Sequence, residues 1–195
     1  MKFFFESEKL NRILKLTQRV LLAGAILLLG YTGFVFFGAR IFQNRENISL
    51  DEQRRNPDTV PSPKAVEQLV GRIEIPRLGV SVVIMEGIEE ETLDRAAGHI
   101  PGTPLPGQIG NVGISAHRDT YFRPLRNIRR DDIITIATPR ADFRYRVLTT
   151  RIVSPEDLTV LSAADSEILT LVTCYPFYFI GPAPSRFIVR AERIT

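Results

Sequence analysis

Hydrophobic and polar positions divide the chain into an apolar stretch, a polar stretch and a long region of short apolar runs. Residues 20–39 contain no charged side chain. As a helix this stretch would be about 30 Å long, which matches the hydrocarbon thickness of a bilayer. A buried helix of a soluble domain normally keeps a polar face, and this stretch has none. We therefore expect a transmembrane helix at residues 20–39.

A cleaved signal peptide is the alternative for this stretch. Its apolar region would be shorter, about 7–15 residues, and would end in a small-x-small cleavage site. Here the stretch ends in Phe37-Gly38-Ala39, with the bulky Phe37 at the −3 position, which favours an uncleaved anchor. Residues 1–19 contain five basic and two acidic side chains. The positive-inside rule therefore predicts a cytoplasmic N-terminus and an exported remainder.

Charge excludes one class of partner. The chain has 25 basic and 22 acidic residues, a net charge of +3. Residues 1–19 account for this whole excess, so the rest of the chain is balanced and has no basic cluster. We therefore predict that the protein does not bind nucleic acid, although its isoelectric point is about 9.2.

Beyond the apolar stretch the pattern changes twice. Residues 40–70 are polar, charged and proline-containing, as in a tether that adds nothing to a core. Residues 71–195 contain short β-type runs separated by turn residues, and many short strands predict a closed barrel or a sandwich. The predicted strands cover residues 72–75, 80–85, 111–116, 133–138, 143–150, 168–174 and 187–191, and short helices are expected at 90–95, 122–128 and 154–158.

Three of these runs end or begin at residues that can carry chemistry. Cys174, the only cysteine, ends one run, His117 follows another, and Arg186 opens the last. A thiol, an imidazole and a guanidinium are the parts of a nucleophilic Cys/His site with an oxyanion-stabilising cation. Counting excludes an internal disulfide and metal sites built from several Cys or His residues, so we expect no metal and no cofactor.

Strand alternation groups these three residues. In each of the three runs, the apolar residues at every second position would point into a barrel. Cys174, His117 and Arg186 would then all project outward and can line one groove. For each residue an ordinary alternative stays open: an inert cysteine, a structural histidine or a solvated arginine. The positions assigned to the inside are Val112, Ile114 and Ala116; Leu169, Leu171 and Thr173; and Phe187, Val189 and Ala191.

The chain contains a second histidine, His99, which competes for the same role. It lies in the glycine- and proline-rich sequence of residues 98–107, where we expect a loop. A loop is a less rigid platform for an acid/base group than a strand end, so we favour His117.

The runs around these residues resemble a known family. Thr170-Leu-Val-Thr-Cys174 matches the TLxTC motif of sortases, and Asn111-Val-Gly-Ile-Ser-Ala-His117 is similar to the sortase strand that ends in the catalytic histidine. Arg186 follows the cysteine where sortases carry their catalytic arginine. The similarity covers residues 71–194. The residues after His117 and the Cys-Tyr-Pro sequence look most like class D sortases.

The resemblance implies a mostly β fold, a closed eight-stranded barrel with short helices, here preceded by one N-terminal transmembrane helix. The expected divisions are a cytoplasmic segment at 1–19, the transmembrane helix at 20–39, a tether at 40–70 and a sortase domain at 71–195. The expected location is the cell membrane, with a single pass and the sortase domain outside the cytoplasm.

The resemblance also implies a cysteine transpeptidase that cleaves an LPxTG-like C-terminal sorting signal through a thioester. Cys174 would be the nucleophile and His117 the general acid/base, while Arg186 would stabilise the oxyanion or hold the substrate. Thr173 and Ser115 flank these residues and are candidates for touching substrate or for plain structure. The expected partners are surface proteins that carry a sorting signal and an amine acceptor, either a cell-wall peptide or a protein lysine.

Two other kinds of function stay open at this point. One is an exported cysteine peptidase or an LD-transpeptidase-like enzyme, although the latter would want glycines next to the cysteine, which Val-Thr-Cys-Tyr lacks. The other is a membrane-tethered binding module without catalysis.

Overall fold

Helix α1, Lys2–Arg55, opens the chain in the computed structural model, which describes residues 2–55, 69–178 and 181–194. The chain divides into two compact units, Met1–Ile41 and Phe42–Thr195. In the first unit large apolar side chains are more than half exposed, for example those of Ile13, Leu28 and Phe37. Among the described residues, α1 is the one helix that is long and apolar enough to cross a membrane. It is therefore a candidate membrane anchor, and it contains the predicted stretch at 20–39.

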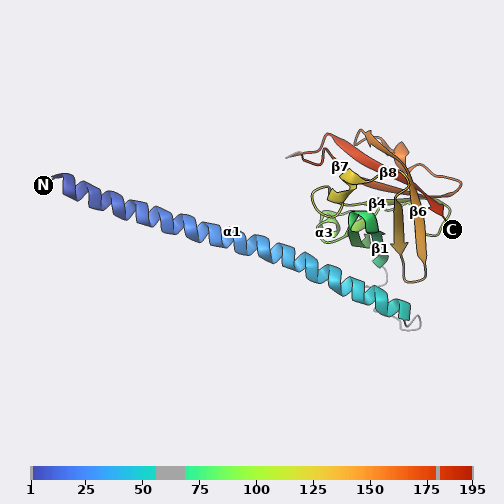
Figure 1. Cartoon of the computed structure of the whole chain (residues 1–195), viewed down its shortest axis with the longest axis horizontal. Helices are drawn as coiled ribbons and strands as arrows, with labels where there is room; N and C mark the ends of the chain where they lie inside the picture. The colour runs from blue at the N-terminus through green and yellow to red at the C-terminus, as the bar shows by residue number, and fades with distance from the viewer. Residues whose placement is uncertain (1, 56–68, 179–180, 195) are drawn as a thin grey trace. The chain divides into compact units, whose positions relative to one another are not determined.

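The second unit contains a closed eight-stranded β-barrel (Figure 1). Around the barrel the strand order is β1-β2-β3-β4-β7-β8-β6-β5, and pairing of β5 with β1 closes it. This arrangement confirms the predicted barrel. The strands are β1 Leu69–Ile75, β2 Val80–Glu86, β3 Ala97–His99, β4 Gly110–Ser115, β5 Ile133–Ala137, β6 Asp142–Val153, β7 Glu167–Tyr175 and β8 Ser185–Ile194.

Short helical segments connect several strands. They are η1 Pro76–Leu78, α3 Glu90–Leu93, η2 Arg123–Asn127 and η3 Leu158–Leu161. The predicted helices at 90–95 and 122–128 coincide with α3 and η2, whereas the third begins at Leu158 and not at 154.

The Arg77 guanidinium in η1 donates hydrogen bonds to both carboxylate oxygens of Asp132, next to β5. These bonds, followed in size by the bond from the Arg129 N–H, lower the pKa of Asp132, which burial alone would raise.

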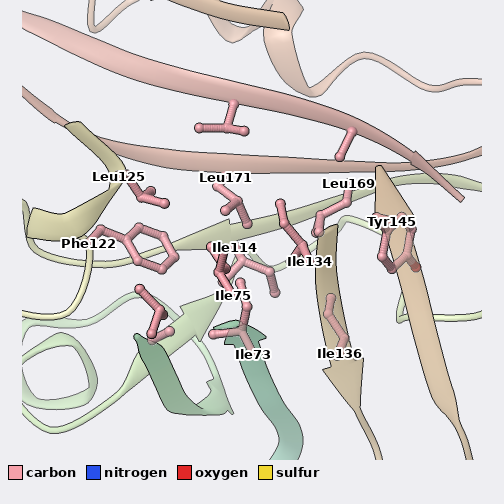
Figure 2. Close-up of a cluster of buried hydrophobic side chains, with 14 of the residues drawn as sticks. Ile73, Ile75, Ile114, Phe122, Leu125, Ile134, Ile136, Tyr145, Leu169 and Leu171 are labelled. Atoms are coloured by element: carbon pink, nitrogen blue, oxygen red, sulfur yellow. The ribbon is translucent and has the colours of Figure 1, made fainter. Parts of the chain in front are cut away.

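Apolar side chains from all parts of the barrel fill its interior (Figure 2). Alternation along each strand sends every second residue inward, so single Ile, Leu and Val side chains from neighbouring strands meet there. Phe122 and Leu125 enter this core from the segment that follows His117, and both are fully buried. Burying one such side chain is worth about 1.5–3 kcal/mol, so the core also fixes the start of the connection after β4.

The segment expected to be a tether contributes to this unit. Helix α1 continues to Arg55, and Leu50 is fully buried against Leu69 and Val83. The expectation that residues 40–70 add nothing to a core is therefore wrong at two places: the helical part supplies Leu50, and residues 69 and 70 already belong to β1, with Leu69 buried. Both segments looked like parts of a polar tether because their apolar residues are few. Residues 56–68 of the expected tether lie outside the described residues.

Candidate active site

Strands β4 and β7 bring His117 level with Cys174. They run parallel, with Ser115 paired to Val172, so two further residues along each strand lead to His117 and Cys174. Two hydrogen bonds hold this end of the pair together: Ala116 N–H donates to the Val172 carbonyl at 3.3 Å, and the Thr173 hydroxyl donates to the Ala116 carbonyl at 2.7 Å. The carboxyl ends of two strands that are distant in sequence therefore meet at one rim of the barrel.

Strand β8 brings Arg186 to the same place. It pairs with β7 in the antiparallel sense, and Cys174 is directly opposite Arg186. Residues directly opposite in an antiparallel pair project to the same face, with Cβ atoms about 4.5–5.5 Å apart. The side chains of Cys174 and Arg186 are therefore neighbours on one face.

That face is the outer one, as alternation predicts. The inner-face positions proposed from the sequence are buried, apart from Phe187, which is partly buried and packs against the core. Cys174 and Arg186 are partly exposed, and the His117 side chain is 38% exposed. A thiol, an imidazole and a guanidinium thus converge where a macromolecular substrate can reach them.

The two flanking candidates have different surroundings. Thr173 is 2% exposed and its hydroxyl is bonded to the Ala116 carbonyl, so it braces the rim from inside the barrel. Ser115 is partly exposed and lies on the same face as His117. Of the two, Ser115 is the one placed to touch a substrate.

Arg186 is held by the connection between β7 and β8. Its Nη1 donates to the carbonyls of Ala183 at 3.3 Å and Ser185 at 3.2 Å. Its charge also reaches Glu156, whose pKa is lowered mainly by a hydrogen bond from the Ser154 hydroxyl and to a lesser extent by Arg186. The guanidinium is thus oriented by backbone carbonyls that lie just before it in the chain.

His117 has a carboxylate beside it that the sequence analysis missed. Asp94 Oδ1, in the turn after α3, lies 3.5 Å from His117 Nε2. The Asp94 side chain is 66% exposed, so this is a contact at the surface. Nothing in the Glu-Glu-Thr-Leu-Asp sequence around it distinguishes Asp94 from its acidic neighbours, because its significance depends on where α3 lies.

His99 has a structural environment, and our description of it as a loop residue was wrong. It ends strand β3 and is 2% exposed. Its Nδ1 lies 2.7 Å from the Glu86 carboxylate, and its Nε2 lies 3.0 Å from both the Pro104 carbonyl and the Thr103 hydroxyl. Both ring nitrogens are therefore engaged inside the protein, away from Cys174.

Side-chain contacts connect η3 to the start of β4, and the chain after β7 to β8. Asn111 Nδ2 donates to the Val160 carbonyl at 2.9 Å and holds the η3 segment against the outer face of β4. On the other side Tyr175, Phe177 and Phe187 form an aromatic cluster. Next to η3, a cavity of about 30 Å³ is lined by Thr149, Arg151, Val160, Thr170, Ile188 and Arg190. Arg190 therefore lines a neighbouring cavity on the face that carries Arg186.

Among the described residues, no three His, Cys, Asp or Glu side chains lie close enough together to hold a metal ion.

The fold and the rim together define a β-barrel protein that has a candidate membrane anchor and a group of Cys, His and Arg side chains at the ends of paired strands. The family model of the sortase domain matches residues 73–194. The chain belongs to the sortase family.

Individual relatives refine this assignment. Sortase D of Bacillus subtilis (strain 168) is 33% identical over 129 residues, which are 66% of this chain and 65% of that protein. Sortase SrtE1 of Streptomyces coelicolor is 29% identical over 152 residues, 68% of this chain and 43% of that protein. The chain thus spans less than two thirds of the length of these curated relatives.

Solved structures agree with the fold. A Clostridium perfringens Sortase D5 transpeptidase has a TM-score of 0.64 and 26% identity, and the match covers 80% of this chain and 98% of that one. Sortase C-1 of Streptococcus pneumoniae has a TM-score of 0.62 and 27% identity, with 71% and 75% covered. Together with the match to Sortase D of Bacillus subtilis, the Sortase D5 structure makes this chain class D-like.

Proposed function

We propose that this protein is a cysteine transpeptidase that cleaves an LPxTG-like sorting signal and joins the released carboxyl end to an amine. The observation that carries the proposal is the rim geometry: Cys174 and Arg186 are opposite each other on β7 and β8, and His117 follows the end of β4, the strand paired with β7, at the level of Cys174. Membership of the sortase family supports the same chemistry.

The first half-reaction forms a thioester. The Cys174 thiolate attacks the carbonyl carbon of the signal's threonine, and negative charge develops on the carbonyl oxygen. The Arg186 guanidinium, next to the thiol, stabilises this oxyanion through its remaining N–H donors. When the intermediate collapses, the C–N bond breaks and protonated His117 gives its proton to the departing amine.

The second half-reaction transfers the acyl group. Neutral His117 removes a proton from an incoming amine, which attacks the thioester carbonyl and expels the Cys174 thiolate. The amine belongs to a cell-wall peptide or to a lysine of another protein. Both acceptor and donor are large, which suits a rim on the outer face better than an enclosed cavity.

Topology belongs to the same proposal. The basic residues before the apolar stretch support an N-terminus in the cytoplasm and a barrel outside it, on the side where sorting signals are processed. The location is then the cell membrane with a single pass. Protease added to right-side-out vesicles should digest the barrel, and protection of peptides containing Cys174 would contradict this orientation.

Trapping the thioester tests the catalytic proposal. The full chain is incubated with peptides of the Leu-Pro-x-Thr-Gly type that vary at x, together with a primary amine, and adducts are located by mass spectrometry. We expect an acyl adduct on Cys174, transfer to the amine, and neither in Cys174→Ala. Hydrolysis without transfer at any amine concentration would indicate a cysteine peptidase, and absence of an adduct would indicate a binding module.

A further inference from the structure

The backbone carbonyl of Arg95 accepts hydrogen bonds from two side chains. Gln43 Nε2, on helix α1, donates to it at 2.6 Å, and the Tyr121 hydroxyl donates to it at 2.8 Å. The Gln43 Oε1 atom accepts from Val83 N–H at 2.9 Å. Strand β3 starts opposite Ile84, so it does not reach this N–H. One side-chain amide therefore joins α1, β2 and the turn after α3.

This turn leads directly to His117. Arg95 follows Asp94, the residue whose carboxylate is 3.5 Å from His117 Nε2. Tyr121 belongs to the turn that starts at His117, since Phe122 N–H donates to the His117 carbonyl at 3.0 Å. The Arg95 carbonyl is thus connected both to the carboxylate beside the imidazole and to the backbone that carries it.

The Tyr121 hydroxyl stays available as a donor. Burial raises the pKa of Tyr121, the hydrogen bond with Gln43 acts in the opposite direction, and the charge of Asp94 raises it further. With the pKa above its ordinary value of 10.0, the phenol is protonated at neutral pH. Both donors to the Arg95 carbonyl are therefore present under working conditions.

The part of α1 from Phe42 onward is fixed at several points within its unit. Leu50 is fully buried in the cluster with Leu69 and Val83. Arg54 donates to the Thr138 carbonyl at 2.8 Å, and the Arg95 guanidinium lies over the Phe42 ring, 5.6 Å from its centroid. Because both ends of this segment are held, the position of Gln43 is set by contacts other than its own hydrogen bonds.

We propose that Gln43 is a positioning residue for His117, acting through the Arg95 carbonyl and the Asp94 carboxylate. The proposal rests on the proposed function, in which His117 is the acid/base group. It makes the helical segment after the anchor part of the catalytic unit. Loss of the Gln43 donor frees the Asp94–Arg95 turn and lets the imidazole leave the geometry needed for proton transfer.

The test compares Gln43→Glu with Gln53→Glu in the full chain, reconstituted in phospholipid nanodiscs. Glutamate at position 43 keeps an acceptor for Val83 N–H but has no donor for the Arg95 carbonyl. Gln53 is a matched control, because among the described residues its side chain donates within α1, to the Ser49 hydroxyl at 3.2 Å. We expect Gln43→Glu to lower kcat about five- to tenfold, the equivalent of one hydrogen bond, with KM unchanged. In an Asp94→Asn background the same change should have little further effect.

Histidine NMR separates positioning from general damage. The chain contains two histidines, and buried His99 is an internal reference. We expect Gln43→Glu to shift the His117 ring signals and to leave those of His99 in place. The Tm of the Gln43→Glu variant should lie within about 2 °C of the Tm of Gln53→Glu. Unchanged His117 signals with a control-like kcat would overturn the proposal, as would shifts in both histidines with a lower Tm. If the wild type fails to process any peptide while the His117 signals still move, the proposed function has failed and the coupling has not.

Discussion

Replacing Leu50 by alanine tests whether the part of α1 from Phe42 onward packs against the barrel. Leu50 is fully buried in contact with Leu69 and Val83, with Met85 packed against the same cluster. Ile48, two residues away on the same helix, is 58% exposed. The pair Leu50→Ala and Ile48→Ala therefore removes comparable apolar volume from a packed and an unpacked position of one helix.

The expected loss of stability in each variant follows from how deeply the side chain is buried. Leu→Ala at buried sites costs about 2–5 kcal/mol, and this small cluster, apart from the main core, suggests the lower part, about 2–3 kcal/mol. For a domain of 150–250 residues each kcal/mol shifts Tm by about 2–4 °C, so Leu50→Ala should lower Tm by about 4–12 °C. At the exposed position of Ile48 the change should stay within about 0.5 kcal/mol, less than about 2 °C.

Near-ultraviolet circular dichroism of the full chain in detergent micelles can follow this transition. The chain has no tryptophan and five tyrosines, one of which, Tyr145, is fully buried in the barrel core. Its signal therefore reports loss of barrel packing and is insensitive to a persistent transmembrane helix. Equal melting of Leu50→Ala, Ile48→Ala and wild type would refute the docking of α1, and with it the basis for a role of Gln43.

The other predictions concern the rim and acid stability. His117→Ala should lower kcat by about 10²–10⁴-fold with little change in Tm, whereas His99→Ala should mainly lower Tm, because it empties a buried hydrogen-bonded site; calorimetry beside kinetics distinguishes them. Arg186→Ala should lower kcat by about 10²–10³-fold, and Arg186→Lys should also be impaired, since lysine lacks the planar donor fork of arginine. Arg190→Ala should retain turnover. If Arg190→Ala loses turnover and Arg186→Ala keeps it, the oxyanion donor is misassigned. Asp132, with its folded-state pKa below 3.8, stabilises the fold above that pH and loses this contribution as pH falls through the folded value; Asp132→Asn should cost about 1.5–3 kcal/mol at pH 7 and flatten the acid limb of a urea-denaturation series.

Local sequence was enough for the features that depend on alternation and on length. The inward set Leu169, Leu171 and Thr173 follows from a period of two, because a strand between core and solvent must alternate. The same parity placed Cys174 and His117 outside before any strand pairing was known. The apolar stretch at 20–39 needed only its length and its lack of charge, since a bilayer imposes both.

Other features depended on pairings between distant segments. Strand β3 has three residues and includes a glycine, so it carries no periodic signal, and it forms because β2 and β4 offer it partners. Because of this pairing, His99 lies in a strand and is buried, and it is not in the loop that we expected. Leu50 looked like one apolar residue in a polar tether, and only the position of Val83 makes it part of a core.

The site divides in the same way. Motifs of neighbouring residues pointed to Cys174, His117 and Arg186 as candidates, because each lies in a strand, or directly after one, whose local pattern is distinctive. Their convergence is a property of register, since it requires β4 parallel to β7 and β8 antiparallel to it. Asp94, Gln43 and Tyr121 carry no local signal at all: an aspartate in an acidic turn, a glutamine in a helix and a tyrosine in a connection gain meaning only from atoms that the fold brings within hydrogen-bonding or ion-pairing range.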